Sequence, residues 1–242
     1  MKQIAIAAAA LLAFGSSTAG ATGINLSWSD CGAAGAASQT FDCTTNTGAP
    51  FSLIASFIPP AGVDEFLGMS AQIDVTTPTA TLPDWWKHGT IECRSTNGMS
   101  TNFDFQSLPV SCTDFYQGQA VGGSLYTVGY GAPNRGRLQV QAAVPFDNRG
   151  PVDAGTEYAA VRVNIQRTRS SGAGSCSGCT VPACIVLNSI QLFQPPDRLN
   201  DPEISNPANS NFVTWQASTV ANCPQSTAAP GKTWGQVKSL YR

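Results

Sequence analysis

The stretch EYAAVRVNIQRTRSSGAGSCSGCTVPACIVLNSIQLF, residues 157–193, is the part of the sequence that decides the fold. In 157–166, apolar side chains alternate with other side chains, and this period of two predicts a half-buried β-strand. In 185–193, both faces are nearly apolar, as in a strand from the middle of a sheet. The Gly- and Ser-rich segment between them, 169–184, continues neither strand. We therefore predict a central hairpin whose loop is pinned by disulfides.

The same period of two recurs along much of the chain. Residues 67–76 alternate most cleanly, with an apolar side chain at every second position. We expect a helical turn at 113–120, which Gly122 and Gly123 end. Further strands are expected at 24–28, 51–58, around Phe103 and Phe105, and at 125–130, 137–144 and 212–215. About nine or ten short strands separated by turn residues predict an all-β chain, a single β-sandwich or jelly-roll-like domain stapled by disulfides.

The two ends of the chain differ from its middle. Residues 1–21 combine a basic start, an apolar run and small residues at Ala19 and Ala21, so we predict a signal peptide cleaved after Ala21, with Ala19 as the other candidate. The β-sandwich then spans 22–194. A polar Pro/Asn-rich extension, 195–231, returns a strand and Cys223 to the domain, and 232–242 has the capping and spacing of a short C-terminal helix.

These features predict a protein secreted or otherwise placed outside the cytoplasm. The apolar run at 4–14 is shorter than the roughly 20 residues that span a bilayer, and no later segment approaches that length, so we expect no transmembrane segment in the mature chain. The layout of a signal peptide, a cysteine-rich β domain and a polar tail resembles that of many exported bacterial proteins, which implies a place in the bacterial envelope.

The cysteines also indicate a location outside the cytoplasm. An even number of cysteines in an exported chain predicts a disulfide framework rather than a zinc site, since the Cys-x2-Cys pair at 176–179 lacks a second such pair. We expect Cys31 to pair with Cys43 and Cys93 with Cys112. Either Cys176 or Cys179 should pair with Cys184, leaving the other for Cys223. All eight cysteines lie beyond the signal peptide: Cys31, Cys43, Cys93, Cys112, Cys176, Cys179, Cys184 and Cys223.

Charge and motifs narrow the possible functions. Only 12% of residues are charged, the net charge is −2 and there is no basic run, which argues against nucleic-acid binding. His88 is the sole histidine, and the chain has neither the G-x-S-x-G motif of esterases in its mature part nor the H-E-x-x-H motif of zinc proteases. Several carboxylates could form a glycosidase pair, but nothing selects one pair. We assign no catalytic residue, no metal and no cofactor.

The candidate ligand-binding residues are aromatic: Trp85, Trp86, His88 and Tyr130. If 85–86 lay on a strand, one indole would enter the core while the other stayed outside with Tyr116, Tyr126 or Tyr130, where it could stack on a sugar. The alternative, which we favour, is that both indoles cap the end of the sandwich.

The sequence therefore predicts a secreted β-sandwich binding or structural module that contacts an extracellular glycan, a cell surface or a surface protein. The alternative is a secreted hydrolase, based on a carboxylate pair or on His88, that acts on an extracellular polymer. A further possibility is that 232–242 is a sorting or docking tag.

Overall fold

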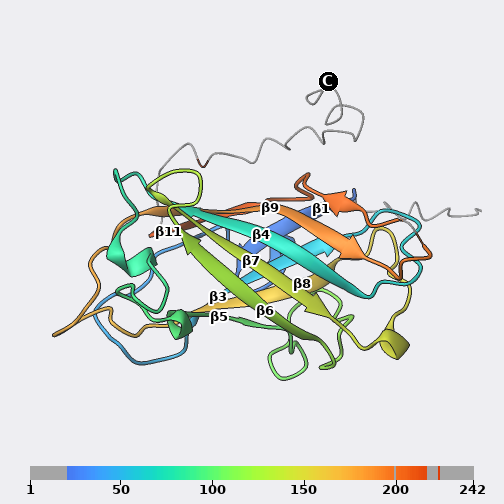
Figure 1. Cartoon of the computed structure of the whole chain (residues 1–242), viewed down its shortest axis with the longest axis horizontal. Helices are drawn as coiled ribbons and strands as arrows, with labels where there is room; N and C mark the ends of the chain where they lie inside the picture. The colour runs from blue at the N-terminus through green and yellow to red at the C-terminus, as the bar shows by residue number, and fades with distance from the viewer. Residues whose placement is uncertain (1–20, 199, 217–222, 224–242) are drawn as a thin grey trace, which may run out of the picture.

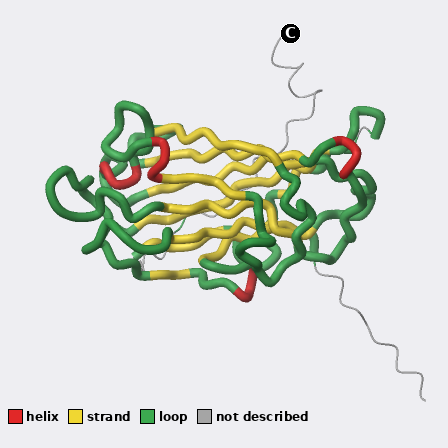
Figure 2. The backbone as a smooth tube through the Cα atoms, turned by 90° about the horizontal axis from the view of Figure 1, so that it is seen from below, coloured by secondary structure: helices red, strands yellow, loops and turns green. Residues whose placement is uncertain are grey.

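The computed structural model describes residues 21–198, 200–216 and 223. The predicted signal peptide and the predicted helix at 232–242 lie outside the described residues, apart from Ala21. Within the described part, the chain forms a sandwich of two β-sheets, with loops gathered at the two ends of the strands (Figures 1 and 2).

The strands and short 3-10 helices follow one another closely along the chain. They are β1 (Gly23–Trp28), η1 (Gly32–Ala34), β2 (Ser38–Gln39), β3 (Phe51–Ile58), β4 (Gly68–Thr76), η2 (Asp84–Trp86), η3 (Thr96–Gly98), β5 (Met99–Asn102), β6 (Val121–Val128), β7 (Arg135–Ala143), η4 (Phe146–Asn148), β8 (Tyr158–Ile165), β9 (Ala183–Phe193), β10 (Glu203–Ile204) and β11 (Phe212–Trp215). The prediction of an all-β sandwich is therefore confirmed for the described residues.

The four-stranded sheet has the order β1-β3-β8-β5 and is antiparallel throughout. The seven-stranded sheet has the order β2-β11-β9-β4-β7-β6, with β10 also paired to β9. Its pairs are antiparallel except the short parallel pair of β11 and β2. Strands β4, β7 and β6 lie side by side and form one broad face of the molecule (Figure 1).

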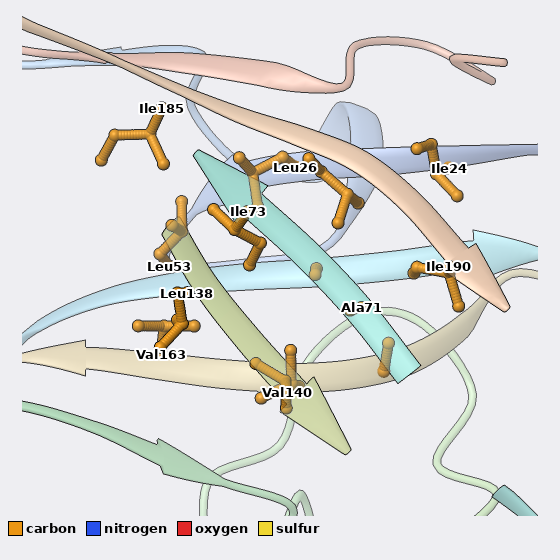
Figure 3. Close-up of a cluster of buried hydrophobic side chains, with 14 of the residues drawn as sticks. Ile24, Leu26, Leu53, Ala71, Ile73, Leu138, Val140, Val163, Ile185 and Ile190 are labelled. Carbon is orange, nitrogen blue, oxygen red and sulfur yellow. The ribbon is translucent and has the colours of Figure 1, made fainter. Parts of the chain in front are cut away.

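The core lies between the two sheets because alternate residues of each strand point inward. From the four-stranded sheet come Leu26, Leu53 and Val163, and from the seven-stranded sheet Ile73 and Leu138; all are buried and lie together in Figure 3. The residues between them in sequence point to the outer faces of the sheets, where several polar ones, such as Asn25 and Arg162, are themselves buried. Burial of this apolar surface, at about 25 cal/mol per Å², is the main stabilising contribution to such a fold.

The central hairpin predicted for 157–193 does not form. Strand β8 lies in the four-stranded sheet between β3 and β5, whereas β9 lies in the seven-stranded sheet between β11 and β4. The loop between them crosses from one sheet to the other. The two strands were predicted correctly and their pairing was wrong, because a period of two shows which face of a strand is buried but not which strand lies beside it.

Three local predictions also need correction. The strand expected around Phe103 and Phe105 lies earlier, at β5, and both rings are buried in the loop that follows it. Residues 113–120 form turns and bends but no helix. Gly122 and Gly123 belong to β6. Strand β6 continues through both glycines because each pairs with a residue of β7. Hydrogen bonding to β7 outweighs the weak intrinsic preference of glycine for a strand.

All eight cysteines form disulfides, but none of the predicted pairs is present. The pairs are Cys31–Cys112, Cys43–Cys179, Cys93–Cys176 and Cys184–Cys223. The prediction joined cysteines that are near in sequence, whereas bonding needs Cα atoms about 6 Å apart in space. Two of these bonds tie the loop between β8 and β9 to segments far away in the sequence.

Candidate functional site

Trp85 and Trp86 lie in the core at one end of the sandwich. They belong to η2, and neither has any exposed surface. Their ring centroids lie 6.1 and 5.2 Å from that of Trp215. Both indoles are therefore at the end of the core, as in the interpretation that we favoured, and the interpretation that leaves one indole outside is wrong. It assumed a strand, in which successive side chains point to opposite faces, and a 3-10 turn does not alternate in this way.

His88 is also buried, in a cluster with Arg94, Trp85 and Tyr126. The guanidinium carbon of Arg94 lies 3.7 Å from the centre of a Trp85 ring, and the Tyr126 ring meets the imidazole edge to face at 5.2 Å. Arg94 Nη2 donates hydrogen bonds to the carbonyl oxygens of Gly98 and Gln166. A side chain on Gly98 would place its Cβ 2.9 Å from His88 Nδ1, so this position has room only for glycine.

The electrostatics of this cluster argue against acid–base catalysis by His88. Burial, together with the charge of Arg94, lowers the pKa of His88 to about 3, and burial lowers the pKa of Arg94 to about 10. His88 makes no ion pair with any residue of the described part. A catalytic triad needs a histidine that is oriented by an acid and reached by a substrate. The cluster has neither property and is an internal packing element.

Tyr130 is the one predicted binding residue that is exposed, with 42% of its surface accessible. It lies in the turn between β6 and β7, where the guanidinium of Arg137 covers its ring at 4.0 Å. Arg137 donates two hydrogen bonds to the carboxylate of Asp74, at 2.6 and 2.8 Å, and one to Oε1 of Gln72, at 2.9 Å. The bonds to Asp74 raise the pKa of Arg137. This network joins Tyr130 to the outer face of the seven-stranded sheet.

That outer face carries rows of uncharged polar side chains. The register places Gln72 beside Gln139 of β7, and Gln139 beside Leu125 of β6. The next row places Ser70 beside Gln141. Side chains directly opposite one another on antiparallel strands share a face and lie about 5 Å apart. The register therefore brings three glutamines, a serine and a leucine from three strands onto one surface.

These side chains line a shallow groove of about 330 Å³. A Cβ added to Gly123 would meet no atom within 4 Å, so the groove is open at this point because β6 has no side chain there. Gln139 and Gln141 are exposed, and neither amide is hydrogen-bonded to another described residue. These two amides are available to a ligand. The groove is lined by Ser70, Ala71, Gln72, Gly123, Ser124, Leu125, Gln139, Val140 and Gln141.

No metal centre is found in the part of the chain that the structure describes. It contains no group of three or more His, Cys, Asp or Glu side chains that could hold an ion. The cysteines are bonded to one another, so none offers a thiolate as a metal ligand. The described residues also include no helix long and apolar enough to cross a membrane.

Comparisons with known proteins add little. No family model matches the sequence, and no curated protein matches it. Among solved structures, the chain is similar to the cohesin module from a family 33 glycoside hydrolase of Clostridium perfringens, with a TM-score of 0.35 and 10% identity, over 80% of this chain and 93% of that one. We infer nothing about a ligand or a partner from a similarity of this extent.

Sequence reasoning missed the groove, although part of its signal is present in the sequence. The polar positions of 67–76 and 137–144 include Gln72, Gln139 and Gln141, each between two core residues. Long amides at the outward positions of two strands could have pointed to a polar face. The sequence does not show that the two strands are neighbours, and it therefore cannot place these amides together.

Proposed function

We propose that this chain is an extracellular binding module that holds an uncharged glycan in the groove on the outer face of β4, β7 and β6. The observation that carries the proposal is the set of three glutamine amides around the groove. The disulfides support a location outside the cytoplasm, because such bonds persist in oxidising compartments.

The chemistry of the groove suits a sugar chain. Each hydroxyl group of a sugar both donates and accepts hydrogen bonds, and an amide side chain offers both functions. The charged groups beside the groove are engaged with one another: Arg137 donates two hydrogen bonds to Asp74, and Arg135 lies 4.0 Å from the same carboxylate. Leu125 and Tyr130 add apolar surface that can lie against the C–H faces of sugar rings. An open groove accepts a polymer without requiring a chain end.

The carboxylates of the described residues give less support to a hydrolase. A general acid needs a raised pKa, but Glu65 and Asp84 each have a pKa lowered by hydrogen bonds, from Arg198 and Lys87 respectively. The pKa values of Asp42 and Asp104 are also lowered, mainly by hydrogen bonds from Thr44 and Ser107. No carboxylate lines the groove. The alternative hydrolase function is therefore not the one we propose.

Alanine substitutions of the groove amides test the proposal. We expect Gln139→Ala and Gln141→Ala each to weaken glycan binding by about fivefold, since a hydrogen bond contributes about 1 kcal/mol and about 1.4 kcal/mol is tenfold in affinity. The measurement is a polysaccharide array followed by calorimetry on any ligand found. Gln106→Ala removes an exposed amide outside the groove and serves as the matched control. Equal binding by all three variants and the wild type would contradict the proposal.

A blocking substitution gives an independent check. Because an added Cβ at Gly123 meets no atom within 4 Å, Gly123→Leu should fill the groove without disturbing the fold. We expect the thermal unfolding midpoint to be unchanged and glycan binding to be lost. A variant that is folded and still binds the glycan with wild-type affinity would place the ligand elsewhere.

A further inference from the structure

The four edges of the two sheets are protected to very different degrees. Along β1, the backbone is covered by the segment 206–210, through hydrogen bonds such as Ile24 N to Asn206 O and Leu26 N to Ser210 O. Strands β2 and β5 are short, with 2 and 4 residues. Strand β6 has 8 residues and pairs only with β7. Among the edges in the described residues, β6 is therefore the long one that remains uncovered.

The hydrogen-bond pattern shows which groups of β6 face outward. Gly129 N donates to Arg135 O, so this opposite pair is hydrogen-bonded. In an antiparallel ladder, hydrogen-bonded pairs alternate with pairs that are not. The odd-numbered residues of β6 therefore bond to β7, and the even-numbered residues turn their N–H and C=O groups away from it. These residues are Gly122, Ser124, Tyr126 and Val128, and no backbone group among the described residues pairs with their outward sides.

Strand β6 also lacks the features that usually prevent edge-to-edge pairing. Its sequence, VGGSLYTV, contains no charged residue and no proline, and its ladder with β7 has no bulge. Natural edge strands are commonly protected by such residues, by bulges or by short length. Val121 and Leu125 are 74% and 63% exposed. An uncharged, regular strand with two exposed apolar side chains is suited to receive another strand.

We propose that β6 pairs antiparallel with β6 of a second copy of this chain, about a two-fold axis that passes by Leu125. An axis perpendicular to the sheet keeps each residue on the same face in both copies, so the residue at the centre must face its own counterpart. With Leu125 at the centre, Gly122 lies opposite Val128 and Ser124 opposite Tyr126. All four outward residues of each copy then form hydrogen-bonded pairs.

This register has two favourable consequences. It satisfies all the outward backbone groups of β6, whereas centring on Ser124 would leave Val128 opposite a residue before the strand begins. It also brings the two exposed Leu125 side chains together in a pair that is not hydrogen-bonded, where Cα atoms approach most closely, at about 4.5 Å. A second copy supplies a strand of matching length, with no charge to repel the first.

The pairing also closes the assembly. Each copy uses its long uncovered edge, and the edges that remain are short or covered, so growth stops at a dimer with the two-fold symmetry that is commonest among oligomers. The two seven-stranded sheets become continuous. Since Gly123 and Leu125 line the groove, the grooves of the two copies meet across the axis and present one longer ligand face.

The proposal is tested by molar mass in solution, measured by light scattering after size-exclusion chromatography and by sedimentation. We expect the wild type to have twice the monomer mass and to dissociate on dilution, because a single strand pair is a small interface. Ser124→Pro removes an outward N–H without taking a bond from β7, and Leu125→Glu places two like charges opposite each other. Both variants should be monomers, with circular dichroism confirming the fold.

The matched control is Ile91→Glu, which replaces a 95% exposed apolar side chain outside β6 and should remain dimeric. Mixing Leu125→Glu with Leu125→Lys should restore a dimer that contains one copy of each, because residue 125 then meets its opposite charge. A wild type that is monomeric at its highest soluble concentration would overturn the proposal. So would a dimer that persists in both β6 variants, or a mixture of the two charge variants that stays monomeric.

Discussion

Replacing Cys43 and Cys179 together by alanine should lower the free energy of unfolding by about 4 kcal/mol. This bond joins residues 136 positions apart, the longest span of the four disulfides. Without it the unfolded chain gains the conformational freedom of an open loop, and in the chain-entropy description the cost grows with the logarithm of loop length. Because Cys31–Cys112 and Cys93–Cys176 remain in the variant and shorten the path between residues 43 and 179, this loop is much shorter than the sequence separation. The folded state also loses a tie between the loop after β2 and the loop that crosses between the sheets.

Denaturant titration of the double variant measures this loss, and the comparison is with Cys184→Ala/Cys223→Ala. That pair spans 39 positions, so its removal should cost about 4 kcal/mol in the same description. Peptide mapping of the wild type by mass spectrometry, without reduction, should recover the peptide that links Cys43 to Cys179. Recovery of a Cys31–Cys43 peptide instead, or a double variant as stable as the wild type, would show that the pairing described here is wrong.

Acidification from pH 6.5 to pH 4 should lower the free energy of unfolding by about 3 kcal/mol, through His88 alone. The pKa of His88 is about 3 in the folded protein and 6.5 in an unfolded chain. Between these values the unfolded state binds a proton that the folded state does not, so stability falls as the pH decreases. Well above pH 6.5 both states hold a neutral imidazole and His88 contributes no pH dependence.

The measurement is the free energy of unfolding at several pH values for the wild type and for His88→Gln. Because His88 is the sole histidine, the variant should lose most of the slope between pH 6.5 and 4.5, whatever its stability at neutral pH. Asp84→Asn is the control. The pKa of Asp84 is lowered from 3.8 by its hydrogen bond with Lys87, so the change in stability that Asp84 causes occurs at a lower pH than that of His88. Equal slopes in the wild type and in His88→Gln would contradict the burial of this imidazole.

The positions of the strands could be predicted well from sequence. The strand expected at 51–58 has these same bounds in the structure, and those at 24–28 and 67–76 differ by one residue. Residues 24–28 and 67–76 follow a strict period of two, because one side of each strand faces the core, and 51–58 is a largely apolar run. Where the period was weak, as around Phe103, the prediction was displaced.

The partners of these strands could not be predicted in the same way. The pairing of β8 with β3, and of Cys31 with Cys112, depends on residues more than eighty positions away. The same limit applies to the candidate site. Tyr130 was named from its residue type and is exposed, but the groove beside it forms only because β4 and β7 are neighbours. Trp85, Trp86 and His88 were named because they are unusual, and each is buried in the core.

The place of β11 has a consequence for biosynthesis. This strand, Phe212–Trp215, lies between β2 from the beginning of the chain and β9 from its later part, and its Trp215 fills the aromatic end of the core. A ribosome delivers these residues after those of every other described strand. The nascent chain therefore cannot complete its larger sheet until residue 215 has left the ribosome. Translation that stops before residue 212 would release a chain that lacks the strand between β2 and β9.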